Sequence, residues 1–427
     1  MTTEHLSPVA ARRVFFTLTF TRWFPVGLVV GIMTLLPLER GLTVTETLTA
    51  MALSGWVVAL LELPTSGFTD AFGRRPVYVA AAVVGLVASA VYLFAHSFWA
   101  FATAAALMGV FRALDSGPLE AWFVDTVHAS RPGADVDGAL ATQGMLLGGG
   151  IAAGALISGG LVWWHPLSGQ SALFLPFLVF VTLSAVHLVV VLVLLREPRA
   201  EVDATAARRA LQSTKEAPVV IREGLGMLRT NRVLRGIVCV EIFWSVAMVV
   251  FETFQPIRLA ELVGGEDRAG ALMGPVASAG WAVFAAGSAL GGLSSRRIGV
   301  ARTAILARIL NSLGAVVMGL VAGPAALVTA YLFTYGLHGT GGPVHAALLH
   351  REARARNRAT VLSMNSMVAF AAFSLAAPLL GVLADRASTQ VAMVTAGAFS
   401  ILGVLCYLPA RRHEKQAAAL ASEPAPL

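Results

Sequence analysis

The sequence predicts an all-α membrane protein with 12 transmembrane helices in two six-helix bundles. Three observations favour this fold. Of the 427 residues, 57% are hydrophobic and 13% are charged, whereas soluble domains contain roughly 25% charged residues. Apolar stretches of about 20 residues, the length needed to cross a bilayer, recur along the chain. The only long polar interruption, residues 196–232, divides these stretches six and six.

Each apolar stretch is expected to be a helix, because the stretches are rich in Gly, Ala and Leu and lack the alternation of barrel strands. The spans are predicted at residues 14–38, 46–68, 76–95, 98–127, 137–162, 171–195, 233–257, 269–293, 302–322, 324–349, 359–384 and 389–410. The polar start, MTTEHLSPVAARR, precedes a run long enough to span, so the sequence predicts a first helix rather than a cleavable signal peptide.

Lys and Arg are distributed unevenly between the two sides of the predicted membrane. With the N-terminus inside, the outward loops contain only Arg40, Arg258, Arg268 and Arg386, and most other Lys and Arg lie in inward segments. Cytoplasmic loops carry this excess, so we expect a multi-pass protein of the inner (cytoplasmic) membrane with both termini cytoplasmic. The asymmetry and anionic lipid headgroups account for the net charge of +7, and no nucleic-acid partner is expected.

The chain is expected to contain four parts. They are an N-terminal six-helix bundle at 1–195, a cytoplasmic linker with short amphipathic helices at 196–232, a C-terminal six-helix bundle at 233–412 and a cytoplasmic tail at 413–427. Gly117-Pro118 recurs as Gly342-Pro343, and Gly73 recurs as Gly299 at nearly the same offset. An internal repeat of six helices is typical of transporters, whose substrate site lies near the bilayer midplane between the halves.

Three motifs resemble those of the major facilitator superfamily. GFTDAFGRRP at 67–76 is similar to the family signature between helices 2 and 3, with Phe68 at the usual Leu position and Ala71 where Arg is frequent. LMGVFRALDSG at 107–117 and GPLEAWFVD at 117–125 resemble the patterns within and at the end of helix 4. The resemblance covers nearly the whole chain and implies the major facilitator fold, most like the 12-helix drug:proton antiporters.

Helix 5 departs from the pattern of those antiporters. Its sequence, QGMLLGGGIAAGALISGG, lacks their Gly-Pro pair. Small residues such as Gly154 still allow close packing of helices.

The resemblance also implies a cytoplasmic gate. Its expected residues are Gly67, Asp70, Gly73, Arg74, Arg75 and Asp125. Asp70 is implied to meet the N-terminal end of helix 11, near residues 358–360, and Arg74 to pair with Asp125. These contacts would form only when the cytoplasmic side is closed.

Ionisable side chains inside the predicted spans are costly in a bilayer and are therefore candidates for function. The candidates for proton or substrate coupling are Arg22, Glu62, Arg112, Asp115, Glu120 and Glu241. On a continuous helix, Arg112 shares a face with Asp115 and with Glu120. A carboxyl group whose protonation depends on its basic partner is what a proton-coupled carrier requires.

Asp115 is the first candidate for the proton site and Glu62, close to the helix-kinking Pro64, is the second. A second interpretation stays open: a static ion pair that joins helix 4 to helices 1 and 2 through Arg22 and Glu62. Glu252 is expected near the headgroups.

Other polar and aromatic residues in the spans have open roles. His338 and His345 share a face of helix 10 and could move protons or only pack. Trp23, Phe24, Phe243 and Trp244 could line an apolar pocket or anchor the spans at the membrane interface. No ligand spacing for a metal is present, and no cofactor is expected.

The sequence thus predicts a secondary active transporter working by alternating access, not an enzyme. We expect proton-coupled efflux of drugs or other amphipathic molecules; the alternative is proton-coupled uptake of a small metabolite. The expected partners are protons, a small-molecule substrate and the lipid bilayer, and the protein is expected to be a monomer. A membrane enzyme would need a nucleophile–base set or a soluble domain, and the sequence shows neither.

Overall fold

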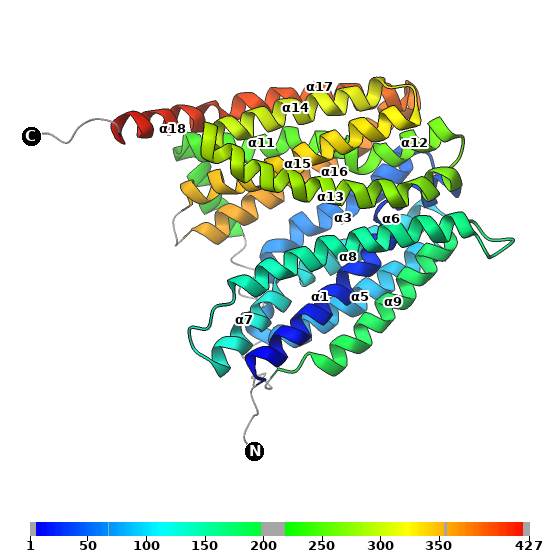
Figure 1. Cartoon of the computed structure of the whole chain (residues 1–427), viewed down its shortest axis with the longest axis horizontal. Coiled ribbons are helices and arrows are strands. Elements are labelled where there is room, and N and C mark those ends of the chain that lie inside the picture. The colour runs from blue at the N-terminus through cyan, green and yellow to red at the C-terminus, as the bar shows by residue number, and fades with distance from the viewer. Residues whose placement is uncertain (1–5, 67, 198–217, 354–356, 422–427) are drawn as a thin grey trace, which may run out of the picture. The chain divides into compact units, whose positions relative to one another are not determined.

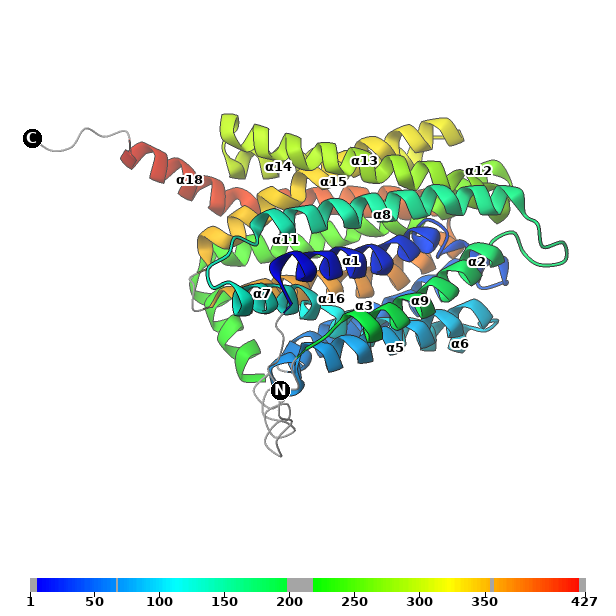
Figure 2. The same cartoon turned by 60° about the horizontal axis from the view of Figure 1, so that its bottom comes forward.

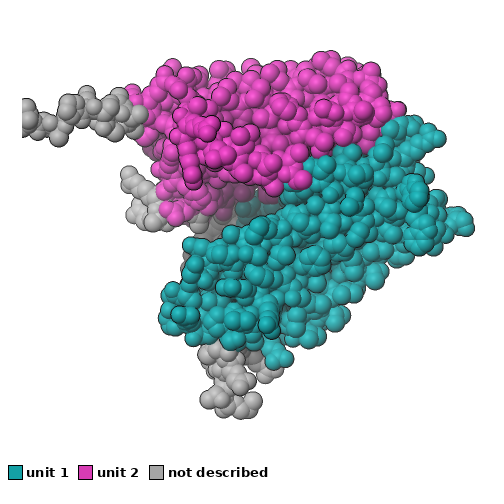
Figure 3. All heavy atoms as spheres, viewed as in Figure 1, with its two compact units in different colours: residues 1–217, 263–281 teal, residues 218–262, 282–427 magenta. Residues whose placement is uncertain are grey.

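The computed structural model describes residues 6–66, 68–197, 218–353 and 357–421, and every regular element within them is helical. The chain divides into two compact units, distinguished by colour in Figure 3. Unit 1 comprises Met1–Ala217 and Val263–Trp281, and unit 2 comprises Pro218–Leu262 and Ala282–Leu427. Most of the predicted linker lies outside the described residues.

Figures 1 and 2 label the helices in two views. Up to residue 197, the helices are α1 (Pro8–Val30), α2 (Leu35–Glu39), α3 (Val44–Ser66), α4 (Phe68–Phe72), α5 (Arg74–Phe94), α6 (Phe98–Asp115), α7 (Pro118–Ser130), α8 (Asp137–Trp164) and α9 (Phe174–Leu194). From residue 232, they are α11 (Arg232–Met248), the π-helical turn η1 (Val249–Phe254), α12 (Gln255–Val263), α13 (Glu266–Ile298), α14 (Val300–Leu320), α15 (Pro324–Glu352), α16 (Arg358–Arg386), α17 (Thr389–Ile401), the 3-10 turn η2 (Leu402–Tyr407) and α18 (Leu408–Ala421).

Eleven segments of the described chain are long and apolar enough to cross a membrane. The predicted span at 324–349 corresponds to α15, which has 29 residues but is not one of the eleven. Thr, Tyr, His and Gly side chains interrupt its apolar residues and lower its hydropathy. The prediction of an all-α membrane protein is confirmed.

The predicted fourth span, 98–127, is not one continuous helix. α6 ends at Asp115, and α7 begins at Pro118. Gly117 between them has a φ of +91°, and Pro118 has no backbone N–H to continue the helical hydrogen bonds. Residues before and after Gly117 therefore do not share the helical face predicted for them.

The predicted seventh span, 233–257, is longer than expected and changes its winding. It continues from α11 through η1 into α12 and ends at Val263. Each turn of π-helix contains an extra residue, so it rotates the side chains that follow, and such turns are frequent at functional sites.

The helix packing repeats from one unit to the other. In unit 1, α5 packs on α6 and α9, and α1 packs on α8. In unit 2, α14 packs on α15 and α17, and α11 packs on α16. In each half these are the third span with the fourth and sixth, and the first span with the fifth. The packing agrees with the repeat that the sequence offsets indicate.

Within unit 1, α1 and α8 approach each other through glycines. A Cβ atom at Gly27 would lie 2.2 Å from the carbonyl oxygen of Ile151, and one at Gly154 would lie 2.3 Å from that of Phe24. Real Cβ atoms do not come so close to backbone, so a larger residue at either position would force the helices apart. Gly154 thus has the packing role expected for it.

The N-terminus of α5 is held by an acidic side chain from the end of α9. Gly73 precedes the helix with a φ of +89°, a conformation that disfavours residues with a side chain. The backbone N–H groups of Arg74 and Arg75 donate to the two carboxylate oxygens of Glu197 at 3.0 and 2.7 Å. The carboxylate satisfies two free donors and faces the positive end of the helix dipole.

The N-terminus of α14 in unit 2 has the same arrangement. Gly299 has a φ of +90°, and the N–H groups of Val300 and Ala301 donate to Glu414 at 3.1 and 3.0 Å. Glu414 lies in α18, which follows the last span as Glu197 follows the sixth. The repeat therefore extends to these two acidic caps.

Candidate functional site

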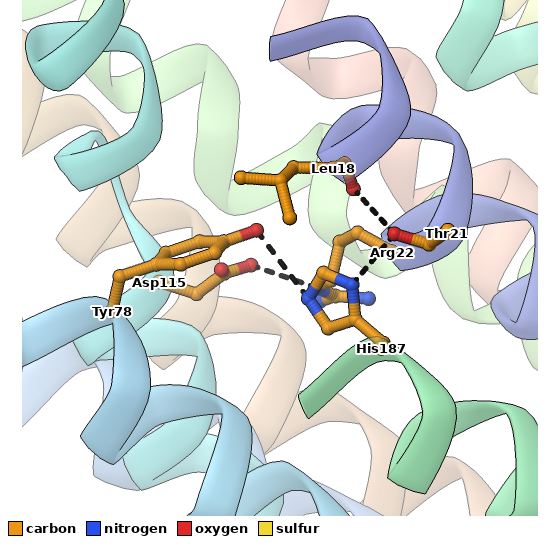
Figure 4. A network of polar contacts seen from close by, with 6 residues as sticks. All are labelled: Leu18, Thr21, Arg22, Tyr78, Asp115 and His187. Carbon is orange, nitrogen blue, oxygen red and sulfur yellow. Dashed lines mark hydrogen bonds and ion pairs between the residues drawn. The ribbon is translucent and has the colours of Figure 1, made fainter. Parts of the chain in front are cut away.

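Unit 1 contains an ion pair between α1 and the end of α6 (Figure 4). Nε of Arg22 lies 3.1 Å from Oδ2 of Asp115, and the two side chains are 12% and 15% exposed. The Arg22 guanidinium also lies over the rings of Trp23 and Phe111, at 4.7 and 4.3 Å from their centroids. Sequence reasoning named both charged residues and left a static pair between these helices as an open interpretation.

A neutral polar network adjoins this ion pair (Figure 4). His187 of α9 is buried, with Nδ1 at 2.9 Å from the Thr21 hydroxyl and Nε2 at 3.5 Å from the Tyr78 hydroxyl. The Thr21 hydroxyl also donates to the carbonyl of Leu18 at 3.3 Å. The network connects α1, α5 and α9. Sequence reasoning missed it, since His187 stands alone in an apolar run and carries no local signal.

Arg112 and Glu62 lie in the same electrostatic environment. Arg112 is one turn before Asp115 on α6, and it interacts electrostatically with Arg22, Glu62 and Asp115. One carboxylate oxygen of Glu62 is buried without a hydrogen-bond partner among the described residues. The structure therefore brings four of the six predicted coupling residues into one cluster in unit 1.

Glu120 does not join that cluster. It follows the break at Gly117, is exposed on α7, and accepts a hydrogen bond from Nε2 of Gln143 at 2.9 Å. The expectation that Glu120 and Arg112 share a helical face is wrong, because the helix between them is interrupted.

Unit 2 contains a second buried acidic group, Glu241 of α11. Its Oε1 lies 2.9 Å from Nε2 of His345 on α15, and the two side chains are only 2% and 4% exposed. Nδ2 of Asn365 donates to the same oxygen at 3.0 Å. His345 is bonded through Nδ1 to the Tyr407 hydroxyl at 2.7 Å. We refer to Glu241, His345, Asn365 and Tyr407 as the Glu241 cluster.

Sequence reasoning named Glu241 and His345 separately but did not pair them. They are 104 residues apart, and no local spacing indicates that α11 and α15 bring them together. The presence of an ionisable side chain in each of two apolar spans was the available signal.

Aromatic rings and a guanidinium lie beside the Glu241 cluster. The Trp244 ring centroid is 6.2 Å from that of His345 and 5.0 Å from that of His338. The guanidinium of Arg308 lies over Trp244, 3.6 Å from the ring centroid.

Glu252 lies elsewhere than at the expected headgroup position. It accepts a hydrogen bond from Tyr335 of α15, so its carboxylate is turned toward the bundle interior.

The predicted gate residues are described in part. Nε of Arg74 lies 3.4 Å from Oδ2 of Asp125, whose side chain is 63% exposed. Nη2 of Arg75 donates to the carbonyl of Leu192 at 3.2 Å. Sequence reasoning missed Glu197, the acid that caps α5 just before these arginines.

Two gate predictions fall on residues whose placement is not described. Gly67 lies outside the described residues. Asp70 belongs to α4, but its side chain is outside the described part of the chain, and so is its predicted contact with helix 11.

The fold agrees with comparisons to known proteins. The family model described as Major Facilitator Superfamily matches residues 15–346, so the chain belongs to this superfamily. It is therefore a multi-pass membrane transporter and not an enzyme. No curated protein matches the chain.

Two solved structures illustrate the shared fold. A mutant of the nucleoside transporter NupG superposes with a TM-score of 0.75 at 12% identity, covering 93% of this chain and 99% of that one. A POT family transporter in complex with 5-aminolevulinic acid superposes with a TM-score of 0.70 at 14% identity, covering 94% and 95%. At such low identity the likeness establishes the fold alone.

Proposed function

We propose that this protein is a proton-coupled secondary transporter in which the Glu241 cluster is a proton site. The observation that carries the proposal is the buried contact between Glu241 and His345, at 2.9 Å and with side chains 2% and 4% exposed. Burying a charged group is costly unless it is paired. A carboxylate and an imidazole in contact form a site where a proton can be held by either group.

The Arg22–Asp115 pair is the second proposed coupling site. It is less enclosed than the Glu241 cluster, and Arg112 and Glu62 provide further charges nearby. A conformational change that separates Arg22 from Asp115 would leave each charged group without its partner, which is costly inside a membrane.

Efflux of amphipathic molecules in exchange for protons is the mode we propose first. Rings gather around His338 in unit 2: the centroids of Trp244, Phe251 and Phe284 lie 5.0, 5.0 and 5.4 Å from that of its imidazole. Aromatic walls near a charged pair suit a cargo with an apolar body and a polar head.

Uptake of a polar metabolite together with protons is the second candidate. Arg308 and Asn311 favour it, because both carry buried polar atoms without a partner among the described residues. One similar structure is a nucleoside transporter and another is a transporter in complex with 5-aminolevulinic acid, and both molecules are small and polar.

The remaining expectations belong to the same proposal. We propose two six-helix bundles, 1–195 and 233–412, joined by a cytoplasmic linker, with both termini cytoplasmic. The gate formed by Gly67, Asp70, Gly73, Arg74, Arg75 and Asp125 would lie on the cytoplasmic side and favour the outward-facing state when closed.

Transport into proteoliposomes under an imposed pH gradient tests the proposal. The cargos are ethidium, an amphipathic cation, and N-acetylphenylalanine, a carboxylate, each with the gradient applied in both directions. If cargo accumulates in the direction opposite to the proton flow, the result supports exchange. If cargo accumulates in the same direction as the protons, it supports joint uptake. If both cargos move at rates that do not depend on the pH gradient in either direction, proton coupling is refuted.

A further inference from the structure

Arg308 of α14 is a buried cation with no hydrogen-bond partner in the described structure. The residue is 4% exposed, and Nε, Nη1 and Nη2 all lack an acceptor among the described residues. Buried charged groups are normally paired, since an unpaired one is strongly destabilising. An arginine held in this way points to an acceptor that the protein itself does not supply.

The guanidinium is held between two walls. On one side lies the ring of Trp244, at 3.6 Å from Cζ to the ring centroid. On the other lies Gly341 of α15, where an added Cβ would come 3.3 Å from Cζ and Nη1. The N–H donors of a guanidinium lie in its plane. A ligand therefore approaches the edge of the group, between Trp244 and Gly341, rather than either face.

A narrow crevice adjoins this edge within unit 2. Arg308, Asn311 and Ser312 of α14 line it opposite Val240, Phe243 and Ala247 of α11. No part of the crevice is wide enough for a water molecule as it stands. Entry of a ligand group thus requires side chains to move, so the occupied site differs in conformation from the one described.

Glu241 is an acid near Arg308, but the two side chains form no ion pair in the described chain. Glu241 interacts with Arg308 electrostatically, but its Oε1 is engaged by His345 and Asn365. The negative charge of Glu241 also disfavours a dianion here, so a single negative charge suits the site best.

We propose that Arg308 binds the carboxylate group of the transported molecule, a small monocarboxylate with an apolar or aromatic body. The guanidinium edge matches a carboxylate with two parallel N–H···O bonds, and Val240, Phe243 and Trp244 contact the body. The inference rests on the proposed transport function and names its substrate class. It applies to either direction of transport.

Ligand-induced thermal stabilisation of the full-length protein in detergent tests this proposal. The probes are acetate, benzoate and N-acetylphenylalanine, each compared with its primary amide at equal ionic strength, and inorganic phosphate. A ligand that binds only the folded state raises the melting temperature. We expect at least one carboxylate to stabilise the wild type more than its amide and more than phosphate. If no carboxylate does so, or if phosphate stabilises most, the proposal is overturned.

Variants on α14 separate binding from a structural role. Arg308→Met is expected to weaken the apparent affinity for the carboxylate at least about tenfold, since a charged hydrogen bond is lost. Arg302→Met, at an exposed position of the same helix, is the matched control and should keep the wild-type response. An unchanged carboxylate response in Arg308→Met would overturn the proposal, whatever the melting temperature without ligand.

Two further variants test the proposal if Arg308→Met does not fold. Arg308→Lys keeps the charge without the paired donors, and Gly341→Ala presses on the guanidinium. Both should weaken carboxylate binding, and wild-type affinity in both would contradict the proposed geometry. Binding in detergent needs no pH gradient, so this result is independent of whether proton coupling fails.

Discussion

The acidic caps of α5 and α14 give a prediction with a magnitude that follows from the structure. Glu414→Ala removes the acceptor of two backbone N–H groups, at 3.1 and 3.0 Å. Loss of an N-terminal cap costs about 0.5–2 kcal/mol. Glu414 also pairs with Nη1 of Arg351 at 2.9 Å, where Arg351 is 52% exposed. Such a pair adds at most about 1 kcal/mol, so we expect a total loss of about 2 kcal/mol in the free energy of unfolding.

Glu197→Ala should cost less than Glu414→Ala. Glu197 accepts two backbone N–H groups, at 3.0 and 2.7 Å, as Glu414 does. Loss of this cap alone is expected to lower the free energy of unfolding by about 1 kcal/mol. The measurement is denaturant unfolding in detergent micelles followed by tryptophan fluorescence. Glu223→Ala, at an exposed position, is the control and should change stability by less than about 0.5 kcal/mol. If Glu414→Ala is no more destabilising than this control, the carboxylate does not hold the helix as described.

Three other substitutions test separate parts of the structure. Gly154→Leu places a side chain where a Cβ alone would lie 2.3 Å from the carbonyl oxygen of Phe24. We therefore expect little folded protein by size-exclusion chromatography. Gly160→Leu, at an open position of the same helix, should behave as wild type. Asp125→Asn should cost less than about 1 kcal/mol in unfolding free energy, because the Asp125 side chain that pairs with Arg74 is 63% exposed; a larger loss would show a stronger gate contact. Burial raises the pKa of Glu39, so the charged form of this side chain lowers the stability of the folded protein above its ordinary pKa. Glu39→Gln should therefore raise the melting temperature at neutral pH. The difference in melting temperature between variant and wild type should shrink as the pH falls through the raised pKa. A constant difference across pH would contradict that assignment.

The fold could be predicted from the sequence because a bilayer imposes a strict requirement on each span. A helix must satisfy its own backbone and stay apolar for about 20 residues, and this leaves a long, visible pattern. α15 shows the limit of that signal: its Thr, Tyr and His side chains lower its hydropathy, although it packs on α14 as its counterpart α6 packs on α5.

Local geometry was harder to predict. The Gly117-Pro118 pair stood in the sequence as a repeated motif, but the pattern did not show that the helix stops there. Because the break separates Arg112 from Glu120, only Asp115 of the two acids expected on the side of Arg112 lies on the same helix.

Most contacts between distant segments could not be predicted; the pairs of Arg22 with Asp115 and of Arg74 with Asp125 are exceptions. Glu197 reaches Arg75 across 122 residues, and Asn365 reaches Glu241 across 124. Hydropathy identified the buried charges as unusual, but it contains no information on which helix faces which. The pairings become visible only when the packing of the helices is known.

The measurement that tests the central claim most directly compares Glu241→Gln with wild type in proteoliposomes, using the cargo that moves under the pH gradient. Two rates are recorded: accumulation driven by the gradient, and exchange of labelled for unlabelled cargo without a gradient. We predict that Glu241→Gln loses gradient-driven accumulation while exchange continues, because Gln cannot carry the proton. Asp267→Asn, at an exposed position at the start of α13, should keep both rates. Gradient-driven accumulation at the wild-type rate in Glu241→Gln would contradict the claim that this buried acid couples protons to transport.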